Sequence, residues 1–96
     1  MSRRSRFDFR LYVAGDAQNS ALALANLAAL CRDRLKDRCK IEIVDVFREP
    51  KRALADRVFM TPTLLKLAPA PDRRIVGTLS LAEPLLQALG LEPLAA

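Results

Sequence analysis

Apolar side chains occupy every second position of residues 7–13, namely Phe7, Phe9, Leu11 and Val13. This period of two is typical of a strand with one buried face. The pattern then changes to a helical one, and its apolar positions are Leu22, Leu24, Ala25, Leu27, Ala28, Leu30, Cys31 and Leu35. They predict a helix with a broad apolar face, and either Asn19 or Ser20 is placed to cap its start.

Residues 41–47 are apolar on nearly both faces, which predicts a central parallel strand covered by helices. A strand, a helix and a second strand in this order form a right-handed βαβ crossover. Pro50 then suits the first position of a short second helix, because that position needs no backbone donor. The side chains spaced to face the sheet from this helix are Ala53, Leu54, Arg57 and Val58.

Two further strands are predicted at residues 63–67 and 73–79, around a turn at residues 69–72. Pro69 and Pro71 bound these strands, because proline cannot lie inside a central strand. Residues 80–83 have the spacing of a capping box and predict a last helix that ends near Gly90. The resulting order βαβαββα is a thioredoxin-like α/β domain over residues 7–92, preceded by a basic arm at residues 1–6.

Composition narrows the choice of function. A chain of 96 residues makes one domain. Its net charge of +5 is concentrated in the N-terminal arm. The chain has four Phe, one Tyr and no Trp, and therefore few aromatic rings on which bases could stack. Nucleic-acid binding is not expected for these two reasons. Asp8 and Arg10 interrupt any signal-peptide core, and no apolar run is long enough to span a membrane. A cytoplasmic protein with reduced Cys31 and Cys39 is predicted.

The residues that thiol or hydrolytic chemistry requires are missing. The loop at residues 15–20, which holds the Cys-x-x-Cys motif in thioredoxin-like enzymes, has no sulfur, and this excludes redox catalysis at the usual site. The chain has no histidine, so a Ser/His/Asp or Cys/His system cannot form, and two cysteines alone do not make a zinc site. A binding module without a cofactor is therefore favoured over an enzyme. Cys31 and Cys39 are interpreted as core fillers, with a regulatory thiol or disulfide as the alternative.

Charged side chains later in the chain have two interpretations. Asp45 ends a predicted strand, and we expect it to contact the basic surface rather than to act as a base. Basic side chains on the later elements, Arg52, Arg57, Lys66, Arg73 and Arg74, are typical of solvated faces. The alternative is that Arg73 and Arg74 edge a docking surface for an acidic partner, since arginine binds carboxylates through two hydrogen bonds.

Several motifs together resemble the KaiB family of bacterial circadian-clock proteins, and the N-terminal sensory domain of the clock kinase SasA is similar more weakly. The matching stretches are LYVAG at residues 11–15, the helix start at 19–20, IVDV at 43–46 followed by Pro50, TPTL at 61–64, the proline-rich turn, RRIVG at 73–77 and residues 79–80. The resemblance implies a non-enzymatic protein that docks on the ATPase ring of a KaiC-like partner and regulates circadian, timing or stress signalling. The resemblance further implies KaiA or a SasA-like kinase as partners.

The resemblance also implies partner contacts at Lys51, Arg52, Arg57, Arg73 and Arg74. A thioredoxin-like redox or stress-response protein without Cys-x-x-Cys is the alternative function.

The family is further known for two folds, the thioredoxin-like one and a tetrameric βαββααβ ground state. The residues assigned to the change between them are Thr61, Pro62, Pro69 and Pro71. Residues 85–91 contain no β-branched residue and favour a helix. We therefore expect the thioredoxin-like state, as a monomer or small oligomer, with a cis peptide bond before Pro62.

Overall fold

The computed structural model describes residues 6–80, 85–87 and 89–90. Its elements are, in chain order, β1 (Phe7–Val13), α1 (Gln18–Arg34), β2 (Cys39–Asp45), α2 (Pro50–Ala55), β3 (Thr63–Ala68) and β4 (Arg73–Val76). Residues 85–87 are helical as well. The chain therefore has the predicted βαβαββα order of a thioredoxin-like fold and not the βαββααβ alternative.

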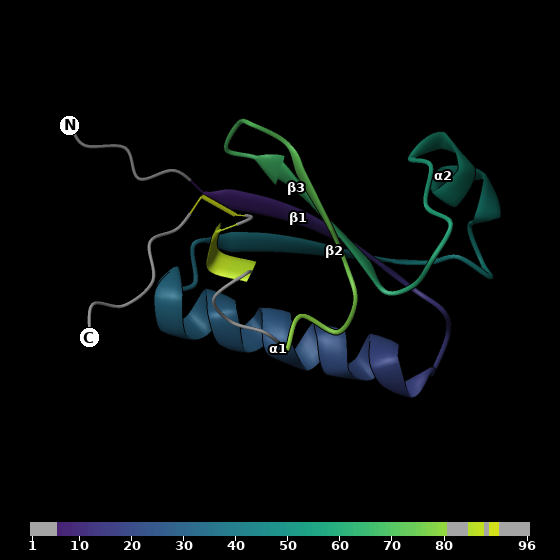
Figure 1. Cartoon of the computed structure of the whole chain (residues 1–96), viewed down its shortest axis with the longest axis horizontal. Coiled ribbons are helices and arrows are strands. Elements are labelled where there is room, and N and C mark those ends of the chain that lie inside the picture. The colour runs from purple at the N-terminus through teal and green to yellow at the C-terminus, as the bar shows by residue number, and fades with distance from the viewer. Residues whose placement is uncertain (1–5, 81–84, 88, 91–96) are drawn as a thin grey trace.

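The sheet is arranged around β1, which has a neighbour along both of its edges. The strand order is β2-β1-β3-β4, with β2 parallel to β1 and with antiparallel pairing of β3 to β1 and of β4 to β3. In Figure 1, α1 runs along one face of the sheet and α2 stands beyond its end. The prediction that residues 41–47 form a central strand is wrong: β3 returns on the far side of β1, so β2 is left at the edge with 43% of Ile43 exposed.

Two strand boundaries also differ from the prediction, and in both cases a turn is the reason. β2 spans Cys39–Asp45, because the Asp45 carboxylate accepts a hydrogen bond from the Phe47 backbone N–H at 2.9 Å and turns the chain there. β4 ends at Val76, because Gly77 follows with a φ of 120°, a backbone conformation that residues other than glycine rarely adopt. Both predicted strands exist, and only their ends are displaced.

The main core lies between α1 and the sheet. The alternating residues of β1 point into it as predicted, and with α1 they supply Phe7, Phe9, Leu11, Val13, Ala23, Leu27, Leu30 and Cys31. The other members are Leu35 at the end of α1, Leu64 of β3, Leu79, and the C-terminal residues Leu85, Leu86 and Leu89. Leu11, Leu27 and Leu64 have no exposed surface, so this interface excludes water along the length of the sheet.

Two expectations about α1 are corrected. Ser20 does not cap the helix: α1 begins at Gln18, and the Ser20 hydroxyl accepts a hydrogen bond from the Ala14 backbone N–H at 3.1 Å. Leu22 and Leu24 lie off the buried face, with exposed fractions of 45% and 39%. A helix repeats every 3.6 residues, so the face that carries Ala23 and Leu27 cannot include positions 22 and 24. The apolar surface of α1 is wider than its buried stripe.

A second, smaller core lies on the opposite face of the sheet, beneath α2. Its members are Tyr12, Val44, Ala53, Val58 and Leu65. Pro50 is in the first turn of α2, and Ala53 and Val58 are buried, all as predicted. The expectation for the other two residues is wrong, because Leu54 is 68% exposed and Arg57 lies outside the helix in an exposed turn.

Lys66 is buried rather than solvated, contrary to its interpretation from the sequence. It pairs with Phe9 in the β1–β3 register, which directs it to the face that α1 covers, and only 3% of it is exposed. Its Nζ donates to the Leu89 carbonyl oxygen at 3.4 Å and lies 5.9 Å from the centre of the Phe7 ring. Burial, followed by the charge of Arg73, lowers the pKa of Lys66. The ammonium group thus ties β3 to the C-terminal helical residues.

The predicted last helix is confirmed where the structure describes it. Leu85 accepts a backbone hydrogen bond from Leu89 at 3.0 Å, which closes one helical turn. Glu83, the second member of the predicted capping box, and Pro84 lie outside the described residues, as do residues 1–5 of the arm and the domain end at residue 92.

Replacing Leu27 by Ala should lower the free energy of unfolding by about 2–5 kcal/mol, because it opens a cavity in the fully buried part of the main core. Urea unfolding followed by circular dichroism measures this change. Leu22→Ala is the matched control on the same helix, since Leu22 is 45% exposed. Equal losses for the two variants would contradict the assignment of the buried face of α1.

Candidate docking surface

The end of the sheet at which β1 and β2 finish exposes large apolar side chains. Phe59 is 80%, Phe47 75%, Leu54 68% and Met60 64% exposed. They belong to α2 and to the loops on either side of it, and Figure 1 shows this helix beyond the end of the sheet. Exposed apolar side chains gathered at one end of a small domain are typical of a protein–protein contact. We call α2 with Phe47 and residues 57–60 the α2 surface.

A C-terminal cap of the Schellman type ends α2. Val58 N–H donates to the Ala53 carbonyl oxygen at 2.8 Å, and Arg57 N–H donates to that of Leu54 at 3.0 Å. Ala53 and Val58 are both buried in the smaller core, which supplies the apolar contact that accompanies this motif. Arg57 occupies the left-handed position with a φ of 56°, where glycine is usual. The turn therefore holds a guanidinium group at the end of the helix against the local backbone preference.

Arg74 completes this cap from the neighbouring strand β4. Its Nη1 donates to the Arg57 carbonyl oxygen at 2.9 Å and its Nη2 donates to the Asp56 carbonyl oxygen. Positive charge at a helix C-terminus is favourable because the last carbonyl groups have no partner within the helix. The guanidinium of Arg74 thus makes intramolecular hydrogen bonds that join the end of α2 to the sheet.

A polar network holds the other side of α2. Arg10 Nε lies 2.8 Å from Glu42 Oε1, and Arg10 Nη1 lies 2.9 Å from Asp56 Oδ2. Arg52 Nη2 lies 2.7 Å from Glu42 Oε2, so Glu42 bridges the two arginines. The Tyr12 hydroxyl donates to the Asp56 carboxylate and lies 3.1 Å from the Arg52 carbonyl oxygen. Five side chains from β1, β2, α2 and the C-cap of α2 are therefore connected.

The network shifts the pKa values of its members in the directions that its charges require. The hydrogen bond from Tyr12, and then that from Arg10, lowers the pKa of Asp56. The two arginines lower the pKa of Glu42. Burial first, and then Asp56, raises the pKa of Tyr12 to about 12. Since both carboxyl pKa values are depressed, their contribution to stability is present at neutral pH and is lost as the pH falls through the folded values.

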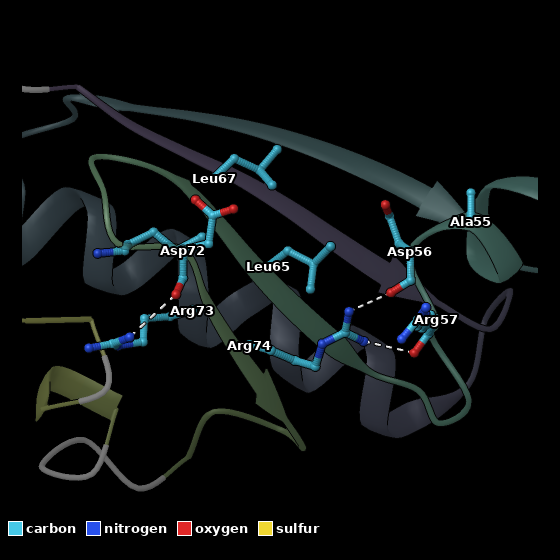
Figure 2. A pocket seen from close by; sticks show the side chains of 9 residues that line it. Ala55, Asp56, Arg57, Leu65, Leu67, Asp72, Arg73 and Arg74 are labelled. Carbon is cyan, nitrogen blue, oxygen red and sulfur yellow. Dashed lines mark hydrogen bonds between the residues drawn. The ribbon is translucent and has the colours of Figure 1, made fainter.

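A pocket of about 370 Å³ lies between the end of α2 and the β3–β4 hairpin. Figure 2 shows Asp56 and Arg57 on one side of it, Leu65 and Leu67 along β3, and Arg73 and Arg74 from β4. The other lining residues are Ala55, Lys66 and Asp72. Arginine and aspartate side chains thus border an apolar floor on β3.

The pocket brings together only part of the predicted contact set. Arg57, Arg73 and Arg74 line it, whereas Lys51 and Arg52 line a separate hollow at the start of α2. Arg52 and Arg74 are engaged in the contacts described above, and Arg73 Nη1 donates to the Asp72 carbonyl oxygen at 3.4 Å. Lys51 and Arg57 are exposed on the α2 surface itself.

The proline residues assigned to the fold change lie at both ends of the sheet. The Thr61–Pro62 bond precedes β3 at the α2 end and is cis, which confirms the prediction. Pro69 and Pro71 lie in the β3–β4 turn at the opposite end, and the bonds before them are cis too, which the sequence did not predict. The Pro62 carbonyl oxygen accepts from the Gly77 N–H at 2.9 Å. The α2 end of β3 is thus joined to the residue that follows β4.

Asp45 was expected to contact the basic surface, and this expectation is wrong. Its Oδ1 accepts from the backbone N–H groups of Gly15 at 3.3 Å and Phe47 at 2.9 Å. The Phe47 ring packs over Gly15, where an added Cβ would lie 3.6 Å from the ring. Asp45 therefore organises the loop that follows β1. No group of three potential metal ligands occurs among the residues that the structure describes.

The polar network was not found from the sequence. Its signal was nevertheless present, because Arg10 and Glu42 are charged residues within two predicted strands, and the parallel register places them opposite each other. Predicting that register would have found this ion pair. The contacts of Tyr12 and Arg52 with Asp56 and Glu42 required the position of α2 relative to the sheet.

The KaiB domain model matches residues 10–91. The chain belongs to the KaiB family. It is 38% identical to "Circadian clock protein KaiB3" of Synechocystis over 89 residues, which cover 93% of this chain and 87% of that protein. Solved structures of other proteins share its fold. The N-terminal domain of Synechococcus elongatus SasA aligns with a TM-score of 0.74 at 18% identity, over 99% of this chain and 94% of that one. Chloroplastic thioredoxin z aligns with a TM-score of 0.69 at 18% identity, over 91% and 81%.

Arg57→Gly should raise the free energy of unfolding by about 0.5–1 kcal/mol, because glycine adopts the left-handed conformation of the α2 cap without a steric penalty. Arg57→Ala is the matched control, since it removes the same guanidinium but keeps a Cβ at a φ of 56°. Chemical unfolding measures both variants. A glycine variant no more stable than the alanine variant would contradict the assigned cap.

Tyr12 should ionise only near pH 12, because burial and the Asp56 carboxylate both oppose the phenolate. It is the single tyrosine of the chain, so its ultraviolet absorbance reports one group. In Asp56→Asn the ionisation should shift to lower pH, whereas Asp16→Asn, at an exposed carboxylate, should leave it in place. The folded-state pKa is raised, so the free energy of unfolding should fall as the pH rises from about 10 to about 12. Circular dichroism at each pH tests whether the chain remains folded. A Tyr12 ionisation at the same pH in Asp56→Asn as in the parent protein would contradict the network.

Proposed function

We propose that this KaiB-family protein is a non-enzymatic docking protein that binds the ATPase ring of a KaiC-like partner and regulates circadian, timing or stress signalling. Family membership and the naming of the Synechocystis relative as a circadian clock protein support the clock role. The fold shared with the SasA N-terminal domain supports a small domain built for contact with another clock protein. KaiA and a SasA-like kinase are further partners that the same hypothesis includes.

The exposed α2 surface is the observation that carries the proposal. Leu54 and Phe59 are 68% and 80% exposed, and the cations Lys51 and Arg57 lie beside them in the chain. Apolar side chains supply most of the affinity of a protein interface, whereas charges at its rim set association rate and partner choice. We infer that the partner presents an apolar patch bordered by carboxylates.

The structure changes which arginines are useful in a test of this surface. Reversing the charge of Arg52 or Arg74 would break an ion pair or the cap of α2, and the fold would then change together with the surface. Lys51 and Arg57 are exposed, so their replacement addresses the partner more directly. Arg73 is a third candidate, at the rim of the neighbouring pocket.

The combined variant Lys51→Glu, Arg57→Glu should weaken binding to a KaiC-like hexamer by at least about 1 kcal/mol, because it places two carboxylates against an acidic rim. The measurement is biolayer interferometry with the hexamer prepared in ATP and in ADP. Leu54→Ala with Phe59→Ala should also weaken binding, by loss of buried apolar area.

Matched controls lie on α1, where Arg32 and Leu22 are exposed. Arg32→Glu and Leu22→Ala should leave the affinity unchanged. An affinity that falls with the α1 variants and not with the α2 variants would move the docking surface to the other face of the molecule.

The alternative function is that of a redox or stress-response protein on the same fold. The loop at residues 15–20 contains no cysteine, and both cysteines lie at the opposite end of α1, away from it. An insulin-reduction assay separates the hypotheses: turnover that disappears on replacing Cys31 or Cys39 would favour the redox function over docking alone.

A further inference from the structure

The two cysteines of the chain meet at the turn between α1 and β2. Cys31 lies in the last turns of α1, on its buried face. Cys39 begins β2 and pairs with Phe7, which directs its side chain to the sheet face that α1 covers. Both therefore face the same interface, where Cys39 packs against the core that contains Cys31, and each thiol shifts the pKa of the other. Both cysteines are free.

The backbone fixes this contact on both sides. Lys36 and Asp37 adopt left-handed φ values of 52° and 61°, which reverse the chain after α1. Asp37 N–H donates to the Cys31 carbonyl oxygen at 2.9 Å, and the Arg38 carbonyl oxygen accepts from the Phe7 N–H at 2.8 Å. One cysteine is thus anchored to the turn and the other to the sheet. The fold therefore fixes the backbone positions of both cysteines at this interface.

The two thiols differ in their access to solvent. Cys31 is 5% exposed, whereas Cys39 is half-buried on the edge strand. Burial raises the pKa of both thiols, and at Cys31 the neighbouring Cys39 thiol raises it further. A solvent-borne oxidant therefore reaches Cys39 first, and Cys31 is the thiol beside it.

We propose that Cys31 and Cys39 form a reversible thiol–disulfide site that a hydroperoxide oxidises, and that the disulfide joins the end of α1 to the start of β2. In the first step the Cys39 sulfur, having lost its proton, attacks a peroxide oxygen. The O–O bond breaks, Cys39 becomes a sulfenic acid, and the other oxygen leaves, as water when the oxidant is hydrogen peroxide.

In the second step the Cys31 sulfur attacks the Cys39 sulfur. The S–O bond breaks, the S–S bond forms, and the Cys31 proton leaves with the hydroxyl group as water. The two thiols together lose two electrons and two protons, and one hydrogen peroxide becomes two waters. A dithiol reverses the reaction by thiol–disulfide exchange.

Peptide mapping of the full chain tests this site. The reduced protein is treated with hydrogen peroxide, its remaining thiols are alkylated, and it is digested with trypsin. Arg32, Arg34, Lys36 and Arg38 separate the cysteines, so they fall in the peptides 11–32 and 39–40. We expect these two peptides from a monomeric chain to be linked, with the loss of two hydrogen atoms, and to be released by dithiothreitol.

Three results would overturn the proposal. They are full alkylation of both cysteines after oxidation, a link formed only between two chains, and conversion of Cys39 to a sulfinic acid without any link. Loss of binding to a KaiC-like partner is not among these readouts, so this test is independent of the proposed docking function.

Single variants test the two roles. In Cys31→Ser, Cys39 should accumulate as a sulfenic acid that dimedone traps. In Cys39→Ser, Cys31 should be oxidised roughly ten-fold more slowly than Cys39 is in Cys31→Ser, because Cys31 is buried. Equal rates would contradict the order of the two steps. Oxidation should raise the melting temperature of the parent protein and of neither serine variant, because only the parent can form a disulfide that closes the loop between residues 31 and 39. If the disulfide is found by mapping but the melting temperature of the parent does not change, the proposed joining of α1 to β2 is contradicted.

Discussion

The pairing of β1 along both of its edges is the constraint on which the rest of the structure depends. A central strand presents two faces, and each must be covered. The odd-numbered residues of β1 meet α1 and form the main core. On the other face Arg10 and Tyr12 stand among charged neighbours, and this face is covered by α2 at one end only. The molecule therefore has one face closed by apolar packing and one closed largely by polar contacts.

This asymmetry explains why α2 exposes so much apolar surface. The helix has six residues, and of these only Ala53 is buried. Its position is set by the ion pairs of Arg10 and Arg52 with Asp56 and Glu42, and by the Arg74 contacts at its C-terminal cap. Because these contacts use the inner side of α2 and its ends, Leu54 remains available on the outer side. The α2 surface is therefore positioned by its polar contacts and not by its own burial.

Periodicity predicted the faces of elements well and their partners poorly. The alternation in β1, Pro50 at the start of α2 and the burial of Ala53 and Val58 all followed from local pattern. The burial of Lys66 depended on the register between β1 and β3. The position of β2 at the edge of the sheet depended on the side of β1 that β3 occupies. These are long-range choices that local pattern leaves open.

The basic residues that were predicted from the sequence as partner contacts have different roles in the structure. Arg57 and Lys51 are exposed there, whereas Arg52 and Arg74 proved to hold α2 in place. A basic residue that supports a surface and one that belongs to it look alike in a sequence, because both follow from the same spacing. Only the positions of Glu42 and of the helix cap distinguish them.

The two faces of the sheet respond to different properties of the surrounding solution. Dissolved ions screen charges over about 10 Å at 0.1 M ionic strength, and they act most strongly on pairs that are partly exposed, such as Arg52 and Glu42. The apolar packing of α1 is strengthened rather than weakened by salts such as sulfate. A rise in salt concentration would therefore weaken the ion pairs that anchor α2 while the main core stayed intact. The position of this helix is thus sensitive to ionic strength in a way that the apolar packing of α1 is not.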